Sequence, residues 1–171
     1  DRAPVAGGRR VRVERCLDAG LVSEVRLAAD RLDEGERRAR LRCLLDLALN
    51  TGMRLAEMAA IRLGDFGPGP IDEELGETWE LQVVGKRQVL RTVPVIPAVL
   101  DAVAEYLRYR GIAGGPRDWP AEVVLLTTLG DEFQRAAPAG GKLSEAAVHG
   151  MLKRHFKRTA EELLQTGREG E

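Results

Sequence analysis

The stretch NTGMRLAEMAAIRLGDF, residues 50–66, sets an arginine directly after a Thr-Gly break and begins an apolar periodicity from it. The apolar residues recur at helical spacing and can bury one face of a helix that runs to about Leu63. Arg54 and Glu57 then stand one turn apart at the helix entrance. A guanidinium at a helix N-terminus suits a phosphate, because its planar fork adds to a dipole that already favours anions. The competing interpretation is an ordinary exposed ion pair of little energetic weight.

A second motif follows in VVGKRQVLRTVPV, residues 83–95. The segments TWELQVV and QVLRTVPV are rich in strand-forming residues, and the second resumes the alternation of apolar and polar positions. They predict a β-hairpin with Gly85, Lys86 and Arg87 near its turn. Lys86 is therefore expected to project from a tight hairpin.

Together the two segments resemble the catalytic domain of the tyrosine recombinases, the phage integrase family, in which a TG-x-R-x-x-E box precedes a GK...R-x-VP hairpin. The resemblance covers roughly residues 40–160. It includes a weaker match of LSEAAVHGMLKRHFKR, residues 143–158, to the helix that precedes the family's histidine-containing box. It implies a mainly α fold with a small antiparallel β-sheet (α+β), the fold of DNA breaking-rejoining catalytic domains, here incomplete at the C-terminus.

The same resemblance implies roles for single residues. Arg54 would be the first catalytic arginine, Glu57 the acid that steadies it, and Lys86 the hairpin lysine that protonates the leaving 5′ oxygen. Further DNA-binding residues are expected in the hairpin and around the last helix: Arg87, Arg91, Lys142, Ser144, Lys153 and Arg154. The turn departs from the family's GKGGK or GKGNK, since this chain has GKRQV, and Arg87 could compete with Lys86 for the phosphate.

The rest of the family's catalytic set has no clear counterpart, because the sequence stops at Glu171. A His-x-x-Arg box and the nucleophilic tyrosine would be expected beyond that point. HFKR, residues 155–158, fits His-x-x-Arg literally, but Lys157 stands where the family carries an apolar residue. We interpret this match as a coincidence on a solvated basic helix face that His155 and Arg158 share with neighbouring basic residues.

The chain's two tyrosines, Tyr106 and Tyr109, lie upstream of the expected nucleophile, and packing roles are predicted for both. The resemblance therefore implies a parent enzyme that recombines or integrates DNA at specific sites by phosphotyrosyl strand exchange, without ATP, metal or other cofactor. Four protomers would assemble on two DNA duplexes. The present chain is expected to lack this chemistry and at most to bind duplex DNA weakly.

Two interpretations from other classes remain. LAEMAAIRLGDF, residues 55–66, also fits the entry of a helix-turn-helix, which would make the chain a noncatalytic DNA-binding module. Alternatively, the protein is a helical interaction protein whose charges are solvated surface. That interpretation predicts that Arg54 and Lys86 lie far apart, whereas the recombinase interpretation requires them to converge.

Composition is compatible with one domain, since 171 residues with 44% hydrophobic content can bury a single core. The net charge of -1 does not favour nucleic acid overall, but the charges are segregated. Residues 64–80 carry acids and no base, whereas residues 142–158 carry five basic residues and one acid. The basic stretch is either a solvated helix face or a contact for DNA phosphates.

Residues 1–12 are expected to form a loose leader, and residues 13–171 the N-terminal portion of a recombinase catalytic domain. Cys16 and Cys43 are isolated thiols without metal spacing, which fits a reducing cytoplasm. His149 and His155 lack a surrounding array of ligands, so no metal is expected. No apolar run is long enough to span a bilayer, and no membrane partner is predicted.

The local patterns also predict the order of elements. Helices are expected over about 13–32, 35–50, 54–63 and 97–110, with a last helix capped by Ser144. GDFGPGP, residues 64–70, is expected to break the chain into a loop that lasts to about Glu77. VVLLTT, residues 123–128, predicts a short strand or buried extended segment, and residues 131–142 a mobile loop.

Overall fold

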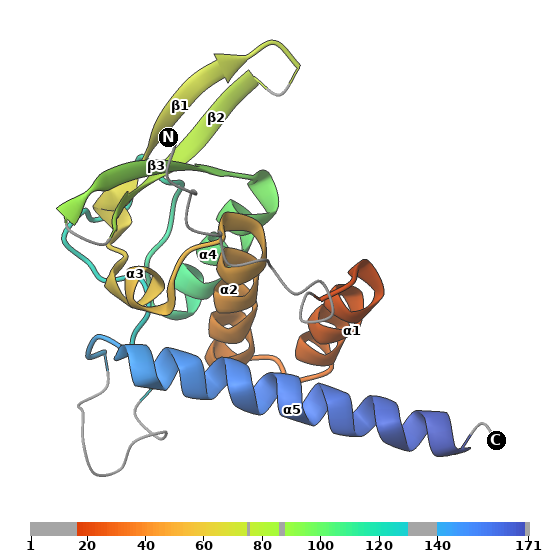
Figure 1. Ribbon diagram of the computed structural model, residues 1–171. Coiled ribbons are helices and arrows are strands. Elements are labelled where there is room, and N and C mark those ends of the chain that lie inside the picture. Colours follow the sequence, from red (N-terminus) through yellow and green to blue (C-terminus); the bar gives the residue numbers. More distant parts are fainter. Residues whose placement is uncertain (1–16, 75, 86–87, 130–139, 170–171) are drawn as a thin grey trace, which may run out of the picture.

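A computed structural model describes residues 17–74, 76–85, 88–129 and 140–169. Among these residues, three α-helices and a 3-10 helix precede an antiparallel sheet, and two α-helices follow it (Figure 1). The elements are α1 (Ala19–Asp30), α2 (Glu36–Thr51), α3 (Leu55–Ala60), the 3-10 helix η2 (Leu63–Asp65), β1 (Phe66–Asp72), β2 (Gly76–Val84), β3 (Leu90–Val95), α4 (Pro97–Tyr109) and α5 (Glu145–Glu169). The predicted α+β class is confirmed.

The three strands form one antiparallel sheet in the order β1-β2-β3. The predicted hairpin is β2 and β3, whose register pairs Val83 with Arg91 and Val84 with Leu90. The prediction of a loop at GDFGPGP is wrong, because the chain from Phe66 onward forms β1 and pairs with β2. β1 is an edge strand, and a proline whose nitrogen faces solvent there removes no hydrogen bond from the sheet. The pairing of β1 with β2 is interrupted between Pro68 and Ile71.

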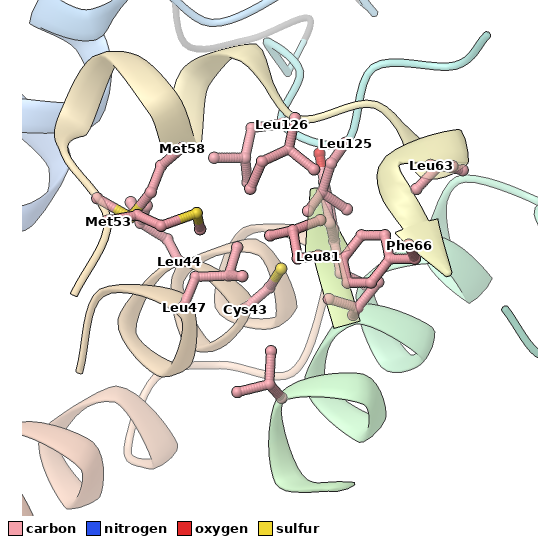
Figure 2. Close-up of a cluster of buried hydrophobic side chains, with 14 of the residues drawn as sticks. Cys43, Leu44, Leu47, Met53, Met58, Leu63, Phe66, Leu81, Leu125 and Leu126 are labelled. Atoms are coloured by element: carbon pink, nitrogen blue, oxygen red, sulfur yellow. The ribbon is translucent and has the colours of Figure 1, made fainter. Parts of the chain in front are cut away.

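The larger of two buried hydrophobic clusters in the described residues lies between the sheet and the helices (Figure 2). Leu44 and Leu47 of α2 meet Leu81 of β2, and all three are buried. Leu125 and Leu126 fill the same core from an extended segment, which confirms the prediction for residues 123–128. Burial of apolar surface on this scale is the main driving force for the fold.

The long helix α5 runs along the side of the molecule opposite the sheet, and α1, α2 and α3 pack against it (Figure 1). Its apolar side faces the core through Val148 and Met151. The predicted cap is confirmed, because Ser144 Oγ accepts a hydrogen bond from Ala147 N–H at 3.1 Å. Within the described residues, no helix is both long and apolar enough to cross a bilayer.

The predicted helix boundaries need two corrections. The first helix begins at Ala19, after the capping residue Asp18, rather than near residue 13. The helix after Arg54 ends at Ala60, and the chain turns through Ile61 into η2. Tertiary packing explains why α3 is short. Ile61 and Leu63 are both buried in the core, and the backbone leaves the α-helical conformation to place them there.

Three predictions concern residues outside those described. They are the leader at residues 1–12, Cys16, and residues 131–139 of the loop expected to be mobile. The end of that loop is described, and it is paired. Lys142 forms a β-bridge with Thr127, and Thr128 N–H donates to the Gly141 carbonyl at 2.8 Å. Cys43 is buried in the core, where desolvation raises the pKa of its thiol far above the usual range.

Candidate functional site

Glu57 organises the entrance of α3. Its Oε2 accepts a hydrogen bond from Arg54 N–H at 2.8 Å, which caps the first turn of the helix. Its Oε1 accepts a second from Arg54 Nη1, also at 2.8 Å. The predicted one-turn pair is thus formed, and both the backbone and the guanidinium of Arg54 are held by the same carboxylate.

A third hydrogen bond reaches Glu57 from the sheet. Arg91 Nη2, on β3, donates to Glu57 Oε2 at 2.7 Å. The Glu57 side chain is 5% exposed, whereas that of Arg54 is 66% exposed and that of Arg91 37%. Two guanidinium groups therefore cover one carboxylate, and the more exposed of them is Arg54.

The hydrogen bonds decide the charge state of Glu57. Burial alone would raise the pKa of its carboxyl, but the Arg54 N–H and the guanidinium groups of Arg54 and Arg91 outweigh burial and hold the pKa below its usual range. Glu57 is consequently ionised at neutral pH. The three side chains together carry one net positive charge, most of it presented to solvent by Arg54.

This pKa shift predicts a pH-dependent stability. A lowered native pKa means that Glu57 stabilises the fold above about pH 4.5, its ordinary pKa, and that this contribution is lost as the pH falls through the native pKa. Glu57→Gln should lower stability at pH 7 by on the order of 1 kcal/mol. It should also shrink the drop in Tm between pH 7 and about pH 3, measured by circular dichroism.

The matched control for that experiment is Glu122→Gln. Glu122 also pairs with an arginine, Arg62, but its side chain is 92% exposed. This variant should keep the wild-type difference in Tm, because exposed pairs contribute little. A Glu57→Gln variant with the full wild-type acid sensitivity would contradict the assignment of a lowered pKa to Glu57.

The hairpin approaches the same pair. A Cβ built on Gly85 would lie 3.6 Å from Glu57 Oε1 and 3.9 Å from Arg54 Nη1. Gly85 N–H also donates to the Val89 carbonyl at 2.8 Å and closes the hairpin end. Lys86 and Arg87 lie outside the described residues, but Gly85 immediately precedes them in the chain. The two motifs of the sequence therefore meet in space, at Arg54 and Gly85.

The turn carries a strained residue. Gln88 has φ +60°, in the left-handed region that glycine and asparagine adopt most readily. Position 88 corresponds to the last Gly of GKGGK and to the Asn of GKGNK. A glutamine in this conformation costs roughly 1 kcal/mol relative to a glycine.

The remaining predicted DNA contacts lie around the start of α5. Lys142, Ser144, Lys153 and Arg154 are all exposed. Within the part of the chain that the structure describes, Lys153 and Arg154 have no acidic side chain in ion-pair range, whereas Arg158 pairs with Glu162. Because α3 packs on α5, this basic segment lies beside the helix that Arg54 begins (Figure 1).

The structure corrects the placement of His155. Its expected position on a solvated face is wrong, since the residue is 4% exposed. Its Nε2 lies 2.8 Å from the Val25 carbonyl oxygen of α1, and this hydrogen bond joins α1 to α5. The helical spacing from Val148 and Met151 places His155 on the buried face, a signal that the count of neighbouring basic residues obscured.

Tyr106 has the packing role predicted for it. Tyr106 is fully buried, and its hydroxyl lies 3.0 Å from Thr127 Oγ1. Tyr109 is 41% exposed, and its hydroxyl donates to Glu34 at 3.4 Å. Among the described residues, no three His, Cys, Asp or Glu side chains are arranged to hold a metal ion.

A mainly helical fold, a three-stranded antiparallel sheet and an Arg-Glu pair beside a hairpin define a recombinase-like catalytic domain. The model of the phage integrase family matches residues 22–166, and the chain belongs to this family. Two curated relatives are each named tyrosine recombinase XerC. The one from Methylobacterium nodulans is 37% identical over 151 residues, which is 84% of this chain and 42% of the relative. The one from Methylobacterium sp. (strain 4-46) is 37% identical over 106 residues, 58% of this chain and 31% of the relative.

The chain therefore spans less than half the length of these relatives. Two solved structures share the fold. Both are of the XerH site-specific recombinase, one bound to its difH substrate before cleavage and one bound to palindromic difH after cleavage. Their TM-scores are 0.58 and 0.60 at 19% and 18% identity. Each covers 84% of this chain, which covers 36% and 35% of the respective structures.

Proposed function

We propose that this chain forms the part of a site-specific tyrosine recombinase that binds duplex DNA and supplies the first arginine of its active site. The observation that carries the proposal is the meeting of Arg54, Glu57 and Gly85, which brings the two sequence motifs to one exposed, positively charged point. This convergence also argues against a helical interaction protein with unrelated surface charges.

In the proposed reaction, Arg54 binds the nonbridging oxygens of the scissile phosphate. Negative charge grows on these oxygens in the transition state, and a guanidinium already held in place by Glu57 stabilises it without reorganisation. Lys86 protonates the leaving 5′ oxygen as a general acid. A tyrosine is the nucleophile of this reaction, and the resulting phosphotyrosyl bond lets the strands rejoin without ATP.

The basic start of α5 supplies the second half of the DNA surface. Lys142, Ser144, Lys153 and Arg154 are exposed on the segment beside α3 and would contact backbone phosphates. Several acidic residues lie instead on the arm formed by β1 and β2, including Asp72 and Glu77. In the proposed recombination reaction, four protomers assemble on two duplexes.

Binding of a labelled DNA duplex, followed by fluorescence anisotropy across a salt series, tests the proposal. The chain should bind with a dissociation constant that rises steeply with salt, because phosphate contacts release counterions. Lys153→Gln with Arg154→Gln should weaken binding at every DNA sequence and reduce the salt slope by about two. No covalent protein–DNA product should form. Absence of salt-dependent binding, or covalent attachment by this chain, would contradict the proposal.

A further inference from the structure

Arg91 differs from the other basic residues of the site in what it contacts. It lies on β3, 34 positions after Glu57, and its Nη2 donates to Glu57 Oε2 at 2.7 Å. Its backbone is fixed by the ladder, where Arg91 pairs with Val83 of β2. A strand, and not a loop, therefore places this guanidinium against the carboxylate that also holds Arg54.

The exposures of the two arginines separate their roles. The Arg54 side chain is 66% exposed and can turn its free donors to a ligand, whereas Arg91 is 37% exposed. Glu57 has two oxygens, and Arg91 takes one of them while Arg54 holds the other through Nη1. Without Arg91, Glu57 Oε2 would keep only the Arg54 N–H as a partner.

Charge gives Arg91 a second effect on Arg54. An isolated Arg54–Glu57 pair is neutral overall and attracts an anion weakly. Arg91 offsets the carboxylate, so that the three side chains keep one net positive charge at the exposed Arg54. Removal of Arg91 should therefore both loosen Glu57 and weaken the field that an incoming phosphate meets.

We propose that Arg91 is a positioning residue, which acts through Glu57 to orient Arg54 and keep the site positive, and is not itself a phosphate ligand. This inference rests on the proposed function, and it links the β2–β3 hairpin to the arginine of α3. It also reassigns Arg91, which the sequence alone placed among the DNA contacts.

The experiment compares the wild-type chain with Arg91→Gln, Arg91→Lys and Glu57→Gln. One readout needs no DNA: the ¹⁵N NMR signals of the Arg54 guanidinium, whose rotation is slowed while Glu57 holds it. Arg91→Gln should average these signals, and Arg91→Lys should restore most of the wild-type pattern, because Lys can still reach one carboxylate oxygen. Unchanged Arg54 signals in a folded Arg91→Gln variant would overturn the inference.

The second readout is the salt dependence of duplex binding. Arg91→Gln should weaken binding by roughly 3- to 30-fold yet leave the salt slope unchanged, whereas loss of a direct phosphate contact lowers the slope by about one. When Glu57→Gln is already present, adding Arg91→Gln should weaken duplex binding by less than about a further twofold. Both substitutions break the same contact between Arg91 and Glu57. Additive effects with a reduced slope would make Arg91 a phosphate ligand and refute the positioning role.

The matched control is Arg117→Gln. Arg117 forms an exposed pair with Glu77, with both side chains about two thirds exposed, so the variant removes the same charge away from Glu57. It should leave the Arg54 signals unchanged. A wild-type chain that binds no DNA would count against the proposed function, and the Arg54 signals would still decide whether Arg91 acts through Glu57.

Discussion

Leu44→Ala should lower the free energy of unfolding by about 3 kcal/mol and the Tm by about 6–12 °C. Leu44 lies on α2 and is fully buried in the core, which also contains residues of α3 and the sheet (Figure 2). The substitution removes transfer free energy and leaves a cavity that rigid neighbours on a helix and a central strand can fill only in part. Thermal and urea unfolding, each followed by circular dichroism, measure the loss.

Leu164→Ala is the matched control, because it makes the same chemical change at a site that is 66% exposed on α5. Alanine also has the higher helix propensity, so this variant should stay within about 0.5 kcal/mol of wild type. Equal losses in the two variants would show that the core does not limit stability. Unaltered urea m-values in both would indicate that the cooperativity of unfolding is preserved.

Periodicity predicted the parts of the fold whose pattern and packing agree. The hairpin of β2 and β3 alternates apolar and polar residues, and α4 opens on Pro97 as the proline at a first helical turn predicts. β1 escaped prediction because FGPGPID contains the residues that usually interrupt strands. Its pairing depends on β2 being available as a partner, which is tertiary information.

The candidate site was predictable in outline and not in detail. The spacing of Arg54 and Glu57 gives their one-turn contact, because i, i+3 neighbours on a helix must lie close. The contact of Arg91 with Glu57 spans 34 positions and depends on how the sheet packs on α3, so local spacing could not give it. His155 shows the opposite case, in which helical spacing held the answer but local charge suggested exposure.

Under the proposed function, Arg54→Gln in a recombinase that carries this chain and the nucleophilic tyrosine should reduce DNA cleavage by about 100- to 1,000-fold. The proposed role of Arg54 is to stabilise charge that develops only in the transition state, so the rate should suffer far more than the affinity. The rate is measured as covalent protein–DNA product on denaturing gels, at saturating protein. Duplex binding should weaken modestly, and the slope of log binding constant against log salt concentration should fall by about one.

Arg62→Gln is the control for this variant, since Arg62 lies eight positions after Arg54, is 53% exposed and pairs with an exposed glutamate, Glu122. It removes one positive charge from a nearby position in the sequence that has no hydrogen bond to Glu57, and it should keep the wild-type cleavage rate. Arg54→Lys separates charge from geometry, because a lysine cannot hold Glu57 and the phosphate at once through a planar fork. If Arg54→Gln cleaved within about threefold of wild type, the transition-state charge would have to be stabilised elsewhere, and Arg54 and Glu57 would be a structural ion pair.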